Sequence, residues 1–154
     1  MIVLDTHAVL WWGNGDPQLS PNALAAIEQE MRRDSGVILI SAITAWEIAL
    51  LLEKGRTTLS MGVDDWLEVG VDVSHSSTSL GLSGYGQSLP LEEIEGVRIV
   101  PVDKATLVES TRLPGDFHKD PADRMIVALA RHFNATLITA DEKINDYRHV
   151  KTLW

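Results

Sequence analysis

The sequence predicts an α/β fold, a three-layer α/β/α sandwich in which helices cover both faces of a central parallel sheet of four or five strands. The first observation behind this prediction is an alternation along the chain. Short, wholly apolar runs alternate with segments of helical periodicity, as in parallel sheets that are buried on both sides. The second is the length of 154 residues with 45% hydrophobic and 23% charged residues. These values are typical of one globular domain spanning residues 1–154.

The composition also limits the function. The chain has no cysteine, which excludes disulfides, thiolate zinc sites and cysteine nucleophiles and fits a cytoplasmic protein. The N-terminus lacks the basic region of a signal peptide, and no apolar run approaches the roughly 18 residues of a membrane span. The net charge of −9 argues against strong non-specific binding to nucleic acid. A nucleic-acid substrate stays compatible with this charge, because bound cations invert the charge of an acidic pocket.

The apolar runs define the expected strands. They are residues 2–4, 37–40, 98–102, 136–139 and 150–153. A helix is expected at 7–12, with Thr6 as its N-cap and Gly13 at its end. Further helices are expected directly after the capping residues Ser20, Ser41, Asp103 and Asp120.

Two helices have apolar stripes at helical spacing. The stripes are Leu24, Ile27 and Met31 in the helix after Ser20, and Ile126, Leu129, Ala130 and Phe133 in the helix after Asp120. Residues 65–70 are expected to form another short helix. Residues 74–90 are rich in serine and glycine and lack periodicity, which is typical of a functional or disordered loop.

Four acidic residues interrupt or border apolar segments: Asp5, Glu47, Asp123 and Asp141. Acidic side chains are almost never fully buried unless their charge is compensated. Asp5 and Asp141 follow strands, and ligands of parallel sheets bind beyond the carboxyl ends of the strands. Glu47 and Asp123 lie on the inward faces of the helices that follow other strands. We therefore expect the four carboxylates to converge on one pocket.

A shared divalent cation would resolve the repulsion between these carboxylates. Hard oxygen ligands select magnesium, with manganese as a substitute. Asp5 and Asp123 are the strongest candidates for direct ligands, and Glu47 and Asp141 either bind the metal or position its waters. Such a centre suits hydrolysis of phosphodiester bonds.

Structural roles compete with this interpretation. Asp5 and Asp141 could each serve only as the N-cap of a following helix, residues 142–146 in the case of Asp141. Glu47 could form a buried ion pair with Arg124 or Lys54.

Asp120 precedes a proline, so it is assigned to helix capping rather than to direct coordination. Thr6, Thr139 and Asp120 are candidates for contacts just outside the metal ligands. His7 and His118 are assigned surface or capping roles.

These residues lie in motifs that resemble the PIN-domain ribonucleases, and most closely the VapC-like toxins of bacterial toxin–antitoxin pairs. The matching stretches are residues 4–12, 41–49, 118–124 and 137–141, in the order of the family. Leu51 departs from the pattern, since relatives often carry lysine there.

The resemblance implies a magnesium-dependent endoribonuclease with Asp5, Glu47, Asp123 and Asp141 as its acidic cluster. It also implies a homodimer, an RNA substrate and inhibition by a small antitoxin whose tail covers the active site.

Two other functions remain open. One is a nuclease of RNA processing or decay, or one that acts on DNA. The other is a non-enzymatic, magnesium-binding, receiver-like signalling module. A receiver-like module would need an aspartate closing a middle strand, but Ser41 follows Ile40. It would also need a lysine closing a later strand, and none follows Thr139.

Overall fold

The five-stranded sheet of the predicted sandwich is present in the computed structural model, which describes residues 1–57, 71–72, 88–89 and 94–154. The strand order is β5-β2-β1-β6-β7, and every pairing in it is parallel. The strands are β1 (Ile2–Leu4), β2 (Ile38–Ser41), β5 (Val97–Val100), β6 (Thr136–Ile138) and β7 (Lys151–Leu153). A separate antiparallel pair joins β3 (Val71–Asp72) to β4 (Ser88–Leu89). The prediction of a parallel α/β fold is confirmed.

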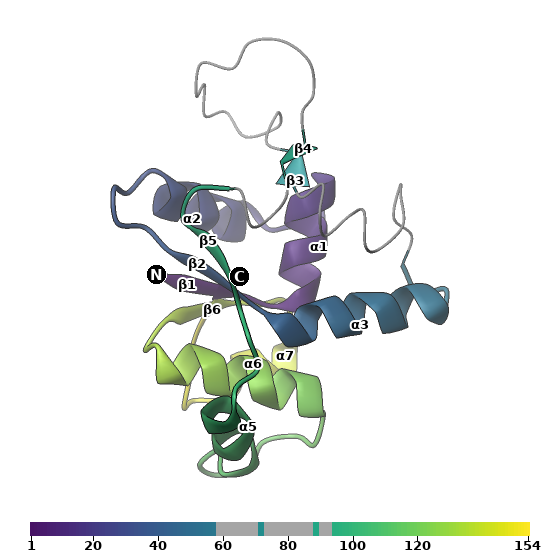
Figure 1. Ribbon diagram of the computed structural model, residues 1–154, viewed down its shortest axis with the longest axis vertical. Coiled ribbons are helices and arrows are strands. Elements are labelled where there is room, and N and C mark those ends of the chain that lie inside the picture. Colours follow the sequence, from purple (N-terminus) through teal and green to yellow (C-terminus); the bar gives the residue numbers. More distant parts are fainter. Residues whose placement is uncertain (58–70, 73–87, 90–93) are drawn as a thin grey trace.

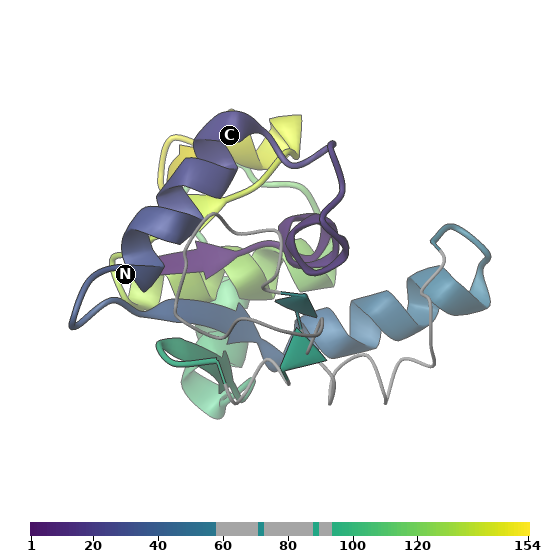
Figure 2. The same ribbon diagram turned by 90° about the horizontal axis from the view of Figure 1, so that it is seen from above.

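Helices cover the sheet on both faces (Figure 1). They are α1 (Thr6–Asn14), α2 (Pro21–Met31), α3 (Ala42–Glu53), α5 (Lys104–Thr111), α6 (Pro121–His132) and α7 (Glu142–Asn145). Helices α1 and α2 lie on one side of the sheet, and α5 and α6 lie on the other. Helix α3 extends sideways from the body of the molecule (Figure 2). None of the described helices combines the length and hydropathy that a bilayer span requires.

Alternate strand residues build two separate cores, because successive side chains of a strand point to opposite faces. In β1, Leu4 packs with α1 and α2, whereas Val3 packs with α6. Both side chains are completely buried. This two-sided burial explains why the central strand β1 and residues 38–40 of β2 are apolar at every position.

Helix α1 begins and ends differently from the prediction. Its N-cap is Asp5, not Thr6, because the Asp5 carboxylate accepts a hydrogen bond from the Thr6 backbone N–H. The helix continues through Gly13 and is closed by Gly15, whose φ of 61° is in the left-handed region that glycine adopts readily. The other predicted caps, Ser20, Ser41, Asp103 and Asp120, are confirmed.

The two predicted stripes are each wrong at one position. Leu24 is 37% exposed and Phe133 is 40% exposed. Phe133 follows the last residue of α6, where the helical spacing no longer applies, and its ring packs edge-on against His132. In α2 the inner face carries Glu30 instead, whose carboxylate accepts hydrogen bonds from Arg33 and from the Val37 backbone N–H. The short helix expected at 65–70 lies outside the described residues, as does most of the serine- and glycine-rich stretch 74–90.

Candidate metal centre

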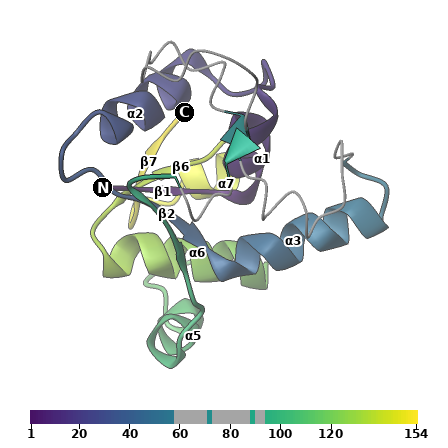
Figure 3. The ribbon, with the colours of Figure 1, turned by 45° about the horizontal axis from the view of Figure 1, so that its top comes forward.

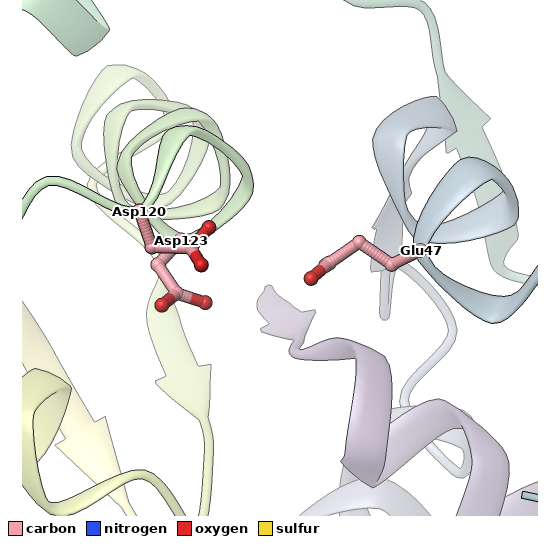
Figure 4. A group of neighbouring side chains, drawn as sticks. All are labelled: Glu47, Asp120 and Asp123. Atoms are coloured by element: carbon pink, nitrogen blue, oxygen red, sulfur yellow. The ribbon is translucent and has the colours of Figure 1, made fainter. Parts of the chain in front are cut away.

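Helices α3 and α6 come together beyond the ends of the strands (Figure 3). Three carboxylates meet between these two helices. Glu47 lies in the second turn of α3, Asp120 caps α6, and Asp123 lies in the first turn of α6. One oxygen of each residue lies within 4.8 Å of an oxygen of both others. Figure 4 shows Asp120 and Asp123 facing Glu47 across the gap between the two helices.

Asp5 lies at the carboxyl end of β1, beneath this group, and only 4% of it is exposed. One carboxylate oxygen accepts the Thr6 N–H and the other accepts the Thr139 hydroxyl, each at 2.7 Å. Asp5 is therefore held rigidly from two sides. Because each carboxylate oxygen has two lone pairs, both oxygens retain capacity for a further partner.

The hydroxyl of Thr6 links Asp5 to the three-carboxylate group. It donates to Oε2 of Glu47 at 2.5 Å. The ion pair considered for Glu47, with Arg124 or Lys54, is absent among the described residues. A neutral hydroxyl thus fixes the direction of the Glu47 carboxylate without removing its charge.

Asp141 caps α7, as one of the two interpretations predicted. Its Oδ1 accepts hydrogen bonds from the backbone N–H groups of Lys143 and Ile144, at 2.7 and 3.1 Å. Its own N–H donates to the Thr139 hydroxyl at 3.0 Å. Thr139 therefore joins Asp5 and Asp141, which places both sequence-predicted contact threonines inside the hydrogen-bond network of the site.

Burial and repulsion from neighbouring carboxylates make Asp5, Glu47 and Asp123 hard to ionise. Burial, followed by the charges of Asp5, Asp120, Glu47 and Asp141, raises the pKa of Asp123 to about 8. Burial, with the charges of Asp5 and Asp120, raises the pKa of Glu47 to about 7 despite the Thr6 hydrogen bond. Burial also raises the pKa of Asp5. A shift of this kind is expected when like charges share a desolvated site.

The described residues supply little positive charge to offset this repulsion. His118 is the nearest basic side chain, with Nε2 3.4 Å from Oδ2 of Asp123. Arg124, considered as an ion-pair partner, instead donates to the backbone carbonyls of Ser110, Phe117 and His118. It holds the loop that carries His118 and leaves the acids uncompensated. An all-oxygen donor set with excess negative charge fits a hard divalent cation.

Compared with the prediction from the sequence, the structure adds Asp120 to the central group of carboxylates. It places Asp5 and Asp141 around this group. Glu47 and Asp123 lie together as expected. Asp120, assigned to capping, does cap α6, but its carboxylate also joins the group. The spacing of three residues was the available signal, because the N-cap and the third helical residue lie on the same side of a helix end. Asp5 and Asp141 lie outside this group of three but act on it through their charges.

With this fold and this acidic site, the chain belongs to the PIN domain family, whose model matches residues 2–150. This match removes the support for a receiver-like module. The chain is 28% identical over 155 aligned positions to Ribonuclease VapC22 of Mycobacterium tuberculosis, covering 99% of this chain and 98% of that protein.

Solved structures share the fold at lower identity. FitAcB from Neisseria gonorrhoeae superposes with a TM-score of 0.60 at 21% identity, covering 100% of this chain and 97% of the other. VapBC2 from Rickettsia felis, bound to a DNA fragment from its promoter, gives a TM-score of 0.59 at 16% identity, covering 99% and 98%. These likenesses confirm the fold.

The raised pKa values predict an unusual dependence of stability on pH. In metal-free protein, Asp123 and Glu47 hold protons up to pH values of about 8 and 7, whereas the unfolded chain releases them near pH 4. The folded state therefore binds more protons than the unfolded state in this window. We expect the free energy of unfolding to fall as the pH rises from about 5 to 8, as linkage requires.

Urea denaturation across this pH range measures the effect. Asp123→Asn should flatten the dependence, whereas Asp34→Asn, which removes a charge from an exposed site, should leave it in place. A dependence as steep in Asp123→Asn as in the wild type would contradict the assignment to this carboxylate.

Proposed function

We propose that this protein is a magnesium-dependent endoribonuclease that acts as the toxin of a toxin–antitoxin pair. The observation that carries the proposal is the meeting of Glu47, Asp120 and Asp123, with Asp5 and Asp141 close enough to raise the pKa of Asp123. Family membership supports a nuclease, and the relative from M. tuberculosis is a ribonuclease by name.

In the proposed centre, Glu47, Asp120 and Asp123 would hold the ion. Asp141 would be a further ligand or position its waters, as the sequence predicts. Asp5, which the sequence predicts as a direct ligand, would bind the ion or its waters from outside this group of three. Magnesium, or manganese in its place, supplies Lewis acidity toward a phosphate and makes a coordinated water more acidic. The negative charge of the carboxylates repels a phosphodiester when no metal is bound. The same charge holds the cation, and the cation attracts the phosphodiester.

The protein's own residues direct this chemistry through their fixed positions. Thr6 holds Glu47, and Thr139 holds Asp5 and supports Asp141. Arg124 fixes the loop that places His118 beside Asp123. A preorganised constellation of this kind spends no free energy on reorganisation when the substrate binds.

The role as a toxin is supported by the relatives. FitAcB, VapBC2 and a third structural neighbour, a toxin–antitoxin complex from Klebsiella pneumoniae, share this fold. The proposal includes a homodimer in the cytoplasm and a cognate antitoxin that covers the acidic centre.

Matched substitutions at Asp120 and Asp123 test the proposed ligands. Asp123→Asn should lower the rate at which a model RNA is cleaved in magnesium. The decrease should exceed the roughly 10–100-fold that follows loss of a residue that only supports a metal ligand. Asp120→Asn retains the capping oxygen that accepts the Ala122 N–H but loses a charge. It should also impair cleavage while leaving the metal-free protein at least as stable as the wild type. Asp120→Ala should in addition lose about 0.5–2 kcal/mol of stability with the cap.

Wild-type cleavage by Asp120→Asn would show that Asp120 is only a helix cap. Full activity of Asp123→Asn would overturn the metal centre itself.

The antitoxin should place an arginine against the acidic centre, because the guanidinium fork pairs with carboxylates at two points. We expect purification from the native operon to yield a complex that does not cleave RNA. Substitution of that arginine by alanine in the partner should release activity. Recovery of active wild-type protein alone, harmless to its host, would contradict the role as a toxin.

A further inference from the structure

A second concave site adjoins the acidic centre. It is a cavity of about 370 Å³ between the loop that precedes α6 and the segment that runs from α7 to β7. Its lining includes Phe117 and His118 from the loop and Lys143, Tyr147, Arg148 and His149 from the segment. Nothing in the proposed cleavage chemistry requires a cavity here.

The walls of this cavity are fixed by contacts between its two sides. The Tyr147 hydroxyl donates to the Pro114 carbonyl at 2.6 Å, and the Phe117 and Tyr147 ring centroids lie 4.5 Å apart. Arg131 donates to the His149 carbonyl at 2.5 Å. The cavity is therefore built into the fold rather than formed by loose surface side chains.

Two cations, Lys143 and Arg148, and two carboxylates, Asp116 and Asp146, line this cavity in a chain whose net charge is −9. Lys143 and Arg148 are both exposed. Within the described ranges, neither forms an ion pair with a carboxylate. Cations without carboxylate partners, beside a site that otherwise repels anions, are suited to an anionic ligand.

The cavity and the acidic centre share a boundary. His118 lines the cavity, and its Nε2 lies 3.4 Å from Asp123. Lys143 follows Asp141 by two residues, and its backbone N–H is bonded to the Asp141 carboxylate. A ligand in the cavity would therefore lie next to a phosphate held at the metal centre.

We propose that this cavity binds one nucleotide of a single-stranded RNA, adjacent to the bond that is cleaved. Lys143 and Arg148 hold its phosphate, and its base lies against Phe117 and His149, two partly exposed rings that pack on the buried ring of Tyr147. The size agrees with this occupant, since ligand cavities begin at about 300 Å³. Basic side chains beside aromatic rings are the usual means of holding single strands without reading their sequence. This assignment rests on the proposed ribonuclease function.

An arginine-bearing antitoxin tail is a poorer occupant of this cavity. Its cations would meet Lys143 and Arg148, whereas the acidic centre next to it would attract them. The two ligands thus separate by charge: the RNA backbone favours the cavity and the partner's arginine favours the carboxylates.

The test is binding of a short, fluorescein-labelled single-stranded RNA, measured by anisotropy in an Asp123→Asn background that suppresses cleavage. The double variant Lys143→Gln/Arg148→Gln should weaken binding, and the slope of log Kd against log salt should fall by about 0.7, the value expected for one lost phosphate contact on a single strand. A matched control is Lys104→Gln/Arg112→Gln, which removes the same charge at a separate concavity on α5. That control should bind like the background protein.

A variant that is expected to bind RNA more tightly excludes misfolding as the cause of an altered affinity. Asp116 also lines the cavity, so Asp116→Asn should tighten RNA binding. With Asp123 restored, the cavity double variant should raise KM for RNA cleavage, and the α5 control should not.

Equal affinities in the cavity and control variants, in a protein that cleaves RNA, would overturn the assignment. Loss of affinity only for the partner protein would also overturn it, in favour of a peptide ligand. Absence of RNA cleavage by the wild type would instead refute the ribonuclease proposal. The cleavage assay shows this outcome independently of the anisotropy measurement.

Discussion

The repulsion among buried carboxylates at one edge of the sheet is the constraint on which the rest of the site depends. Asp5 is 4% exposed, yet it lies near enough to Glu47 and Asp123 to raise the pKa of both. Helix N-termini offset part of this cost, because Asp5, Asp120 and Asp141 each accept backbone N–H groups at the start of a helix. The capping bonds hold the acids in place, but they do not neutralise them. A divalent cation would compensate the charge that remains.

The same constraint shows how much of the site could be read from the sequence. The wholly apolar strands and the acids that follow them predict both the sheet and the edge where ligands bind. The position of Asp120 before Pro121 predicts a helix cap, with at most a contact just outside the metal ligands. Only the packing of α6 against α3 brings its second role into view. For Thr6 the sequence predicts a cap or a contact just outside the metal ligands, and the structure shows that its hydroxyl orients Glu47 while Asp5 caps the helix.

Other features depend on contacts that local pattern cannot contain. Glu30 is buried among hydrogen-bond donors from the α2–β2 connection, whereas a helical stripe predicts an apolar residue there. The cavity beside the acidic centre forms between segments about 30 residues apart, which the Tyr147–Pro114 hydrogen bond brings together. Lys143 and Arg148 look like ordinary surface cations in the sequence. Their place on one cavity with Phe117 and His118 appears only when the chain is folded.

Thermal unfolding with and without manganese tests the central claim most directly, that the carboxylates form a cation site. At 100 times its dissociation constant, a ligand that binds only the folded state adds about 2.7 kcal/mol of stability. We expect the wild-type melting temperature to rise with manganese, and a Glu47→Gln/Asp123→Asn variant to be more stable than the wild type without metal and insensitive to it. An unchanged melting temperature of the wild type, or an equal rise in the variant, would contradict the account.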